Sequence, residues 1–290
     1  MLTSNEIKKQ MQQGNIIIKN LSENPLNKPN SCDLRIGNTL YDFDYGIVDT
    51  RKGPSYLQEV LNDKPINLRK ITIPESGLLL QPHKVYLTKT IEEVEAHEVV
   101  PIMHGKAMLS LLGVRIELTS GYKHENFKGP FILSIIATKP TIIYPDIKIA
   151  NLSFVPSLTE PNSIRQINEN MSCGVYSSGM LSGAEIKRRM EQENPDIIIT
   201  PQDKIVINPN SVNLTLNDTI GIYSDPILDM KKDNKVETTQ IGEDGMWLYP
   251  DEVYLGRTNE WTETENLIPM MSGRSSLGRN GLHVHCSAGM

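Results

Sequence analysis

Short stretches of alternating or β-branched residues recur along most of the chain. Examples are GNIIIKN at 14–20, KVYLTKT at 84–90, PFILSIIAT at 130–138 and DIIITP at 196–201. Alternation of apolar and polar positions is typical of a strand with one buried face. Proline and glycine turns separate such stretches roughly every 8–12 residues, which favours a sandwich or barrel over a parallel α/β sheet. The pattern therefore predicts a mainly β protein.

The chain also repeats itself. MLTSNEIKKQM at 1–11 returns as MLSGAEIKRRM at 180–190, and both have the spacing of an amphipathic helix with a cationic face. PNSCDLRIGNTLY at 29–41 returns as PNSVNLTLNDTIGIY at 209–223, a Pro-Asn turn followed by an alternating strand. We therefore expect two copies of one β domain, each opened by a helix.

Further along, the two copies stay in register over a long span. LLLQPHKVYLTKT at 78–90 matches MWLYPDEVYLGRT at 246–258, at an offset of 168 residues. The same offset carries VPIMHGKAMLSLLGVRI at 100–116 onto IPMMSGRSSLGRNGLHV at 268–284. A Ser- and Gly-containing stretch without apolar periodicity lies between the copies. The expected division is a domain at 1–167, a linker at 168–179 and a second domain at 180–290.

Composition narrows the choice of partners and compartment. The 290 residues carry a net charge of -6 without a basic tract, which argues against nucleic acid as the main partner. No apolar run approaches the roughly 18 residues of a membrane helix, and no secretory signal opens the chain. Its three cysteines fit no disulfide or zinc spacing. We expect a cytoplasmic protein without a membrane partner.

The segment with the most functional chemistry is GRSSLGRNGLHVHCSAGM at 273–290. Its glycines allow a tight backbone, and its serines and amides supply neutral donors between two arginines. An arginine fork meets phosphate oxygens two at a time, so such a loop suits a triphosphate. A solvated glycine-rich β-turn is the plainer interpretation of the same residues.

These residues resemble the superfamily of deoxycytidine triphosphate deaminases and deoxyuridine triphosphatases (dCTP deaminases and dUTPases). The family pattern is Arg-Ser-Ser-Leu-x-Arg-x-Gly-Leu, followed by a strand and an Ala-Gly turn, and residues 274–289 meet all of it. Arg279 favours the deaminase branch, because the triphosphatase branch usually has lysine at that position. The resemblance implies two tandem dUTPase-like domains with a distorted β-barrel or jelly-roll fold. It also implies a homotrimer with active sites between subunits.

The resemblance also assigns roles within the motif. Ser275 and Arg279 would be catalytic, because they would orient the attacking water and stabilise charge near the base as ammonia departs. Arg274 and Ser276 would hold phosphates, and the carbonyl of Ala288 would help to hold the water. The full set expected to bind the substrate is Arg274, Ser275, Ser276, Leu277, Gly278, Arg279 and Ala288.

The implied reaction is the hydrolytic deamination of dCTP to dUTP and ammonia, without zinc and with Mg2+ accompanying the triphosphate. It needs a glutamate on the strand after the motif to move protons. In the first copy Ser134 stands in that place. The motif of the first copy is replaced as well, by Lys106, Ala107, Met108 and Leu111. The first copy is therefore expected to be a degenerate structural domain.

In the second copy the sequence reaches Met290 before the glutamate segment. Three explanations stay open: an exon or fragment of a longer deaminase, a protein that binds nucleotides without converting them, or a strand supplied by another polypeptide. A non-catalytic scaffold and a dUTPase are the alternative functions. The duplicated chain, rich in Lys, Asn and Ile, would suit a bacteriophage.

Metal chemistry has little support in the sequence. His283 and His285 share one face of a predicted strand, but two ligands make a poor metal site. The signature of zinc deaminases, H-x-E followed by P-C-x-x-C, is absent from the sequence. We therefore expect no metal bound directly by protein side chains.

Overall fold

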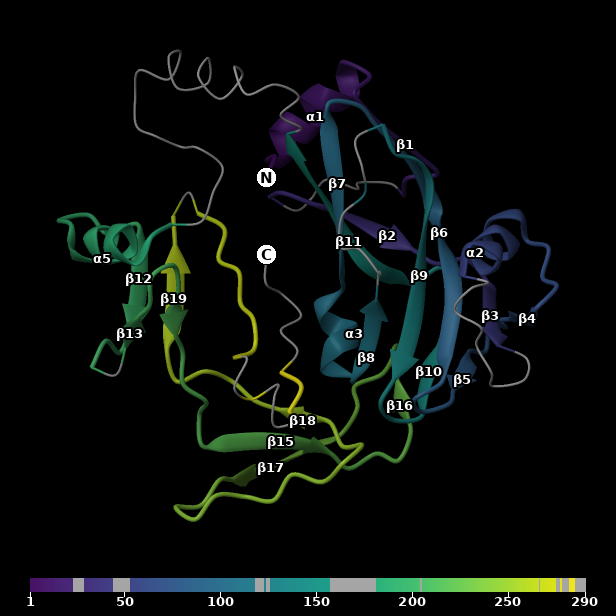
Figure 1. Ribbon diagram of the computed structural model, residues 1–290. Coiled ribbons are helices and arrows are strands. Elements are labelled where there is room, and N and C mark those ends of the chain that lie inside the picture. Colours follow the sequence, from purple (N-terminus) through teal and green to yellow (C-terminus); the bar gives the residue numbers. More distant parts are fainter. Residues whose placement is uncertain are drawn as a thin grey trace. The chain divides into compact units, whose positions relative to one another are not determined.

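The structure is a computed structural model in which two compact units can be described, each by itself (Figure 1). It describes residues 1–22, 29–43, 53–117, 123, 126–156, 181–203, 205–265, 267–274, 277 and 282–284. The first unit comprises Met1–Arg165 and Pro226–Asp233, and the second comprises Gln166–Asp225 and Asn234–Met290. Strands dominate both, so the predicted mainly β fold class is confirmed. The expected linker at 168–179 lies outside the described residues.

The first unit contains three sheets and three helices among its described residues. One sheet runs β4-β3-β6-β9-β8, with β1 also paired to β6; the others run β2-β11-β7 and β16-β10-β5. The elements are α1 (Ser4–Gln12), β1 (Ile16–Lys19), β2 (Cys32–Arg35), β3 (Thr39–Phe43), α2 (Gly53–Asn62), β4 (Leu68–Thr72), β5 (Leu78–Leu80), β6 (Val85–Ala96), β7 (Val99–Gly105), α3 (Ala107–Leu111), β8 (Val114–Glu117), β9 (Lys128–Ala137), β10 (Thr141–Ile143), β11 (Lys148–Pro156) and β16 (Leu228–Asp229).

The core of the first unit follows from the alternation in its two longest paired strands. On β9, Phe131, Leu133 and Ile135 are buried, and the residues between them are only half-buried. β6 alternates in the same way along its antiparallel partner. Because successive side chains point to opposite faces of a strand, one face of this sheet forms the core. The other face stays partly accessible.

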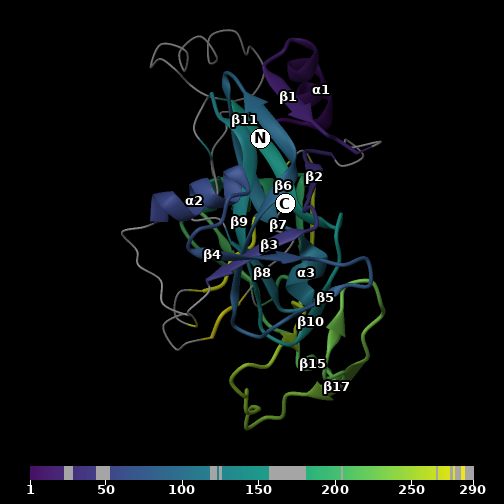
Figure 2. The same ribbon diagram turned by 90° about the vertical axis from the view of Figure 1, so that its right-hand side faces the viewer.

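Helix α2 covers part of that second face (Figure 2). Tyr56 and Val60 of α2 pack in a buried cluster with Tyr41 and Leu68. The helix lies in the connection from β3 to β4, at 44–67, whereas the connection from β15 to β17 in the second half, at 224–235, is shorter. This insertion accounts for the change of offset between the copies, from 180 before it to 168 after it.

The second unit has shorter strands. They pair as β12-β19, β13-β14 and β17-β15-β18. A small cluster of Ile186, Ile197 and Ile199 forms its buried centre. The elements are α5 (Gly183–Glu191), β12 (Ile197–Thr200), β13 (Val206–Ile207), β14 (Val212–Asn213), β15 (Thr219–Tyr223), β17 (Val236–Gln240), β18 (Tyr254–Leu255) and β19 (Trp261–Thr264).

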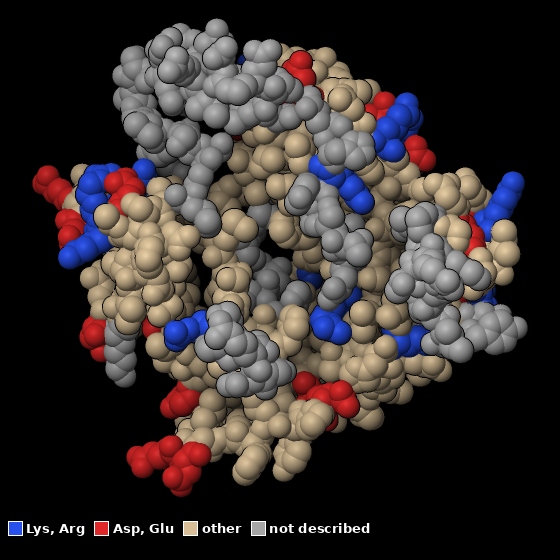
Figure 3. Space-filling model, in the orientation of Figure 1, with Lys and Arg blue, Asp and Glu red and all other residues tan. Residues whose placement is uncertain are grey.

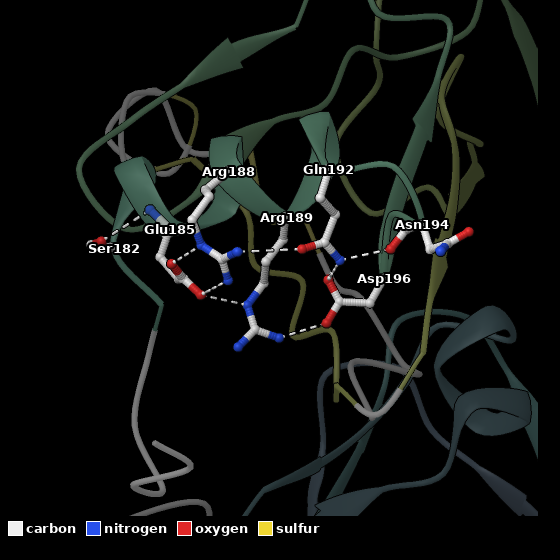
Figure 4. A network of polar contacts seen from close by, with 7 residues as sticks. All are labelled: Ser182, Glu185, Arg188, Arg189, Gln192, Asn194 and Asp196. Carbon is white, nitrogen blue, oxygen red and sulfur yellow. Dashed lines mark hydrogen bonds and ion pairs between the residues drawn. The ribbon is translucent and has the colours of Figure 1, made fainter. Parts of the chain in front are cut away.

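Helix α5 is fixed to the following strand by a polar network (Figure 4). Ser182 caps the helix by accepting a hydrogen bond from the backbone N–H of Glu185. Arg189 is buried and donates to Glu185 at 2.8 Å and to Asp196 at 2.6 Å. Hydrogen bonds from Arg188 and Arg189 lower the pKa of Glu185 to about 2. Acidic and basic side chains are therefore mixed over α5, on the left of Figure 3.

The two halves repeat contacts as well as sequence. β1 pairs with β6 through Ile16↔Ala96, and β12 pairs with β19 through Ile197↔Thr264. The shifts that relate these pairs are 181 and 168 residues, close to the offsets between the two copies in the sequence. This shared register supports the proposal of a tandem duplication, whose boundaries stay a prediction.

One segment of the second half belongs to the first unit. β16 pairs in parallel with β10, and Leu228 is fully buried there. The Tyr144 hydroxyl donates to Asp229 at 2.9 Å, and the ammonium of Lys231 lies 4.1 Å from the centre of the Tyr144 ring. The compact units therefore differ from a simple division of the chain near its middle.

Candidate functional site

The described part of the motif begins with a turn built on Gly273. A Cβ atom at this glycine would lie 2.9 Å from the Cβ of Val284, so the close approach of the two segments requires glycine. The backbone N–H of Leu277 donates to the carbonyl of Arg274 at 3.0 Å, and that of Leu282 donates to Leu277 at 3.1 Å. Arg274 is exposed. The turn thus presents this guanidinium to solvent.

The first unit builds the same approach at the matching positions. A Cβ atom at Gly105 would lie 3.2 Å from the Cβ of Ile116. Gly105 and Ile116 precede Gly273 and Val284 by the offset of 168 found in the sequence. Both halves therefore bring this pair of positions close together, and they differ in the sequence between them.

Most of the predicted site residues lie outside the described residues. These are Ser275, Ser276, Gly278, Arg279 and Ala288. Leu277 is described, with 38% of its surface exposed. The roles assigned to this set, including catalysis by Ser275 and Arg279, stay predictions.

In the first unit the motif positions form a short helix. Lys106 precedes α3, and its ammonium contacts Asp33 at 3.0 Å. Met108 and Leu111 stand in place of Ser276 and Arg279, and they are 63% and 47% exposed. Apolar side chains supply no donors for phosphate or water. This surface therefore lacks the chemistry of the second copy's loop.

Ser134, at the position expected for the glutamate, lies on β9. It pairs with Leu87 of β6 and, by strand alternation, shares a face with Ile132. Leu87 and Ile132 both pack against the cluster that contains Tyr56 and Val60 of α2. Helix α2 therefore covers part of the face on which Ser134 lies.

Two buried carboxylates accept hydrogen bonds at equivalent positions in the two halves. The sequence patterns did not predict them. Glu92 accepts hydrogen bonds from the backbone N–H of Arg35 at 2.7 Å and from its guanidinium at 2.8 Å. Glu260 accepts from the backbone N–H of Thr215 at 2.9 Å and from its hydroxyl at 2.6 Å. Both carboxylates bind the segment that follows the Pro-Asn turn, Glu92 at the end of β2 and Glu260 just beyond β14. The spacing of 168 between them is the only signal in the sequence that could have found them.

A hollow of about 490 Å³ lies elsewhere on the first unit, with Arg69, Lys84 and Tyr86 in its lining. Burial alone would raise the pKa of Asp42, but hydrogen bonds from Arg69 and Lys84 outweigh it, and the pKa lies below its usual value. Because one buried carboxylate engages both cations, the hollow is a weaker candidate for a nucleotide than the motif turn.

Metal and membrane sites find no support in the described part of the chain. It contains no group of three His, Cys, Asp or Glu side chains that could hold a metal ion. His283 is exposed, and its predicted companion His285 is outside the described residues. None of the described helices is long and apolar enough to span a bilayer.

Comparison with known proteins places these features in context. The family model described as dCTP deaminase-like matches residues 1–157 and 180–290. The chain is 51% identical over 110 residues to a "dCTP deaminase, dUMP-forming" of Leptospira biflexa, and 50% identical over 110 residues to one of Hathewaya histolytica. Each match covers 38% of this chain and 62% of the relative. The chain thus spans less than two thirds of these curated relatives.

A solved structure shows the fold. The 2'-deoxycytidine 5'-triphosphate deaminase of Agrobacterium tumefaciens aligns with a TM-score of 0.63 at 16% identity. The alignment covers 89% of this chain and 76% of that one. At this identity the likeness concerns the backbone alone, and it agrees with the dUTPase-like β fold expected from the motif.

Proposed function

Because the chain belongs to the dCTP deaminase-like family, we propose that its second unit binds dCTP at the turn of residues 273–284 and serves the deamination of this nucleotide. The observation that carries the proposal is the contrast between two equivalent turns. Arg274 is exposed on one of them, whereas Lys106 on the other is paired with Asp33. An exposed guanidinium can meet phosphate oxygens, whereas an ammonium paired with a carboxylate is already engaged.

The proposed chemistry replaces the cytosine amine by a water oxygen at C4. Water adds to this carbon, ammonia leaves, and the base becomes uracil. A proton acceptor near the water makes the attack possible and then protonates the departing amine. Ser275 and Arg279 are the proposed catalytic residues. A glutamate is the group expected to carry out this proton transfer, and in the first half Ser134 stands at its position.

The curated relatives are named dUMP-forming. If this chain serves the same conversion, the products are dUMP, ammonia and diphosphate, so the triphosphate is cleaved as well as bound. Formation of dUTP without cleavage is the simpler outcome. We also propose that Mg2+ accompanies the triphosphate and that the chemistry needs no zinc.

The proposed assembly is a homotrimer. Light scattering would test it, because a trimer has three times the chain mass of 32.6 kDa.

A second candidate function is nucleotide binding without conversion. Ser134 favours it for the first half, because a serine stands there at the position expected for the glutamate. The two candidates share the dCTP site and differ only in whether ammonia is released.

The binding proposal is tested by titrating the chain with dCTP and, separately, with dCMP. Both tryptophans, Trp247 and Trp261, lie in the second unit and are exposed, so their fluorescence reports on that unit. We expect dCTP to bind at least roughly tenfold more tightly than dCMP, because dCMP lacks two phosphates that can accept charge-assisted hydrogen bonds. If dCTP and dCMP bind with equal affinity, the second and third phosphates are not bound and the proposed triphosphate site is wrong.

A further inference from the structure

The first unit contains a compact group of charges at the place that corresponds to the phosphate side of the motif. Lys106 contacts one oxygen of Asp33 at 3.0 Å, and Lys148 contacts the other at 3.1 Å. The Asp33 carboxylate is only 14% exposed. One nearly buried carboxylate therefore holds two ammonium groups together.

The two halves differ here in a coordinated way. Lys106 corresponds to Arg274 at an offset of 168, and Asp33 corresponds to Asn213 at an offset of 180. The half with the exposed arginine has a neutral amide, and Asn213 accepts a hydrogen bond from Asn208 at 2.9 Å. The half with the paired lysine has a carboxylate. The cation is thus kept in both halves, and among the described residues only the cation of the first half has a recorded carboxylate partner.

From this contrast we infer that the first unit contains an anion site for a phosphate group, formed by Lys106 and Lys148, and that Asp33 occupies it. The inference rests on the proposed function for the chemistry of the ligand. A carboxylate with two ammonium partners satisfies the same donors that a phosphate oxygen would. The first unit is therefore closed to phosphate by its own side chain.

The surrounding charges are balanced, so one substitution changes their sum. Arg35 lies two residues from Asp33 on β2 and is bound to Glu92 at 2.8 Å and to Asp146 at 2.9 Å. Across the sheet, Asp33 pairs in register with Asn151, which pairs with His104. Burial lowers the pKa of His104, which favours its neutral form. The charges of the three cations, Lys106, Lys148 and Arg35, cancel those of the three carboxylates, Asp33, Glu92 and Asp146. Asp33→Asn would therefore leave one positive charge in excess.

The test compares Asp33→Asn with its parent in an Arg274→Ala background, using inorganic triphosphate as the titrant and calorimetry as the readout. Arg274→Ala weakens the proposed site of the second unit, and because both proteins carry this substitution, the difference between them reports on the first unit. We expect Asp33→Asn to tighten triphosphate binding by roughly tenfold or more. Adding Lys106→Met should abolish the gain.

Asp146→Asn in the same background is the matched control. It changes the net charge by the same amount and affects a carboxylate that is 66% exposed. If Asp33→Asn and Asp146→Asn improve binding equally, the effect is general electrostatics and the inference fails. It also fails if Lys106→Met leaves the gain intact. Should Asp33→Asn unfold the unit, as circular dichroism would show, the smaller variant Asp33→Ser is held to the same outcomes.

Discussion

Arg274→Ala should weaken dCTP binding by about 10- to 100-fold, because a charge-assisted hydrogen bond to phosphate contributes roughly 1.5–3 kcal/mol. Arg274 is exposed on a turn whose geometry is set by the approach of Gly273 to Val284. The alanine variant keeps both of these residues, so the turn should persist without its guanidinium. Calorimetric titration with dCTP measures the change in affinity.

The matched control for this loss is Lys106→Ala, at the equivalent position of the first unit. Its ammonium is paired with Asp33, so its removal should leave dCTP affinity nearly unchanged. A loss of about tenfold in Lys106→Ala would show that the first unit binds nucleotide in its native form. If Arg274→Ala leaves the dCTP affinity unchanged, Arg274 does not bind the phosphates and the proposed site is wrong.

Glu92→Ala should lower the free energy of unfolding of the first unit by about 3 kcal/mol, because it leaves a largely buried guanidinium without its main partner. The Glu92 carboxylate is fully buried, and it also accepts the backbone N–H of Arg35. Hydrogen exchange of the amides in β2 and β6 measures the stability of this unit without interference from the other one.

Asp146→Asn is the control for that variant, because Asp146 binds the same guanidinium from a position 66% exposed. An exposed ion pair contributes about 0–1 kcal/mol, so this variant should change the unfolding free energy little. Asparagine also tolerates the left-handed backbone of Asp146, whose φ is 60°. Equal losses in the two variants would contradict the view that burial sets the value of the Glu92 contact.

Local patterns in the sequence predicted much of this fold. The alternation along 84–90 and 130–138 appears as β6 and β9, because a two-residue period fixes which face of a strand is buried. The repeated helix starts became α1 and α5, each with a hydroxyl at its N-cap. The same offset of 168 that aligned the sequences also relates the glycine contacts of the two turns.

Contacts between distant residues were not predictable in this way. Asp33 and Lys106 are separated by 73 residues, and no local period indicates that they meet. Helix α2 was not predicted, although the change of offset between the copies marks an insertion in that part of the sequence. β16 belongs to the first unit because it pairs with β10. Only two residues of each strand pair, and so short a strand has no sequence pattern that identifies its partner.

The number of dCTP molecules bound per chain tests the central claim most directly. Equilibrium dialysis against labelled dCTP should give one site per 290-residue chain in the wild type. This site should weaken in Arg274→Ala and persist in Lys106→Ala. Two sites per chain would contradict the account, because the first unit would then be open. A single site that is lost in Lys106→Ala but kept in Arg274→Ala would also contradict the account, because nucleotide binding would then belong to the first unit.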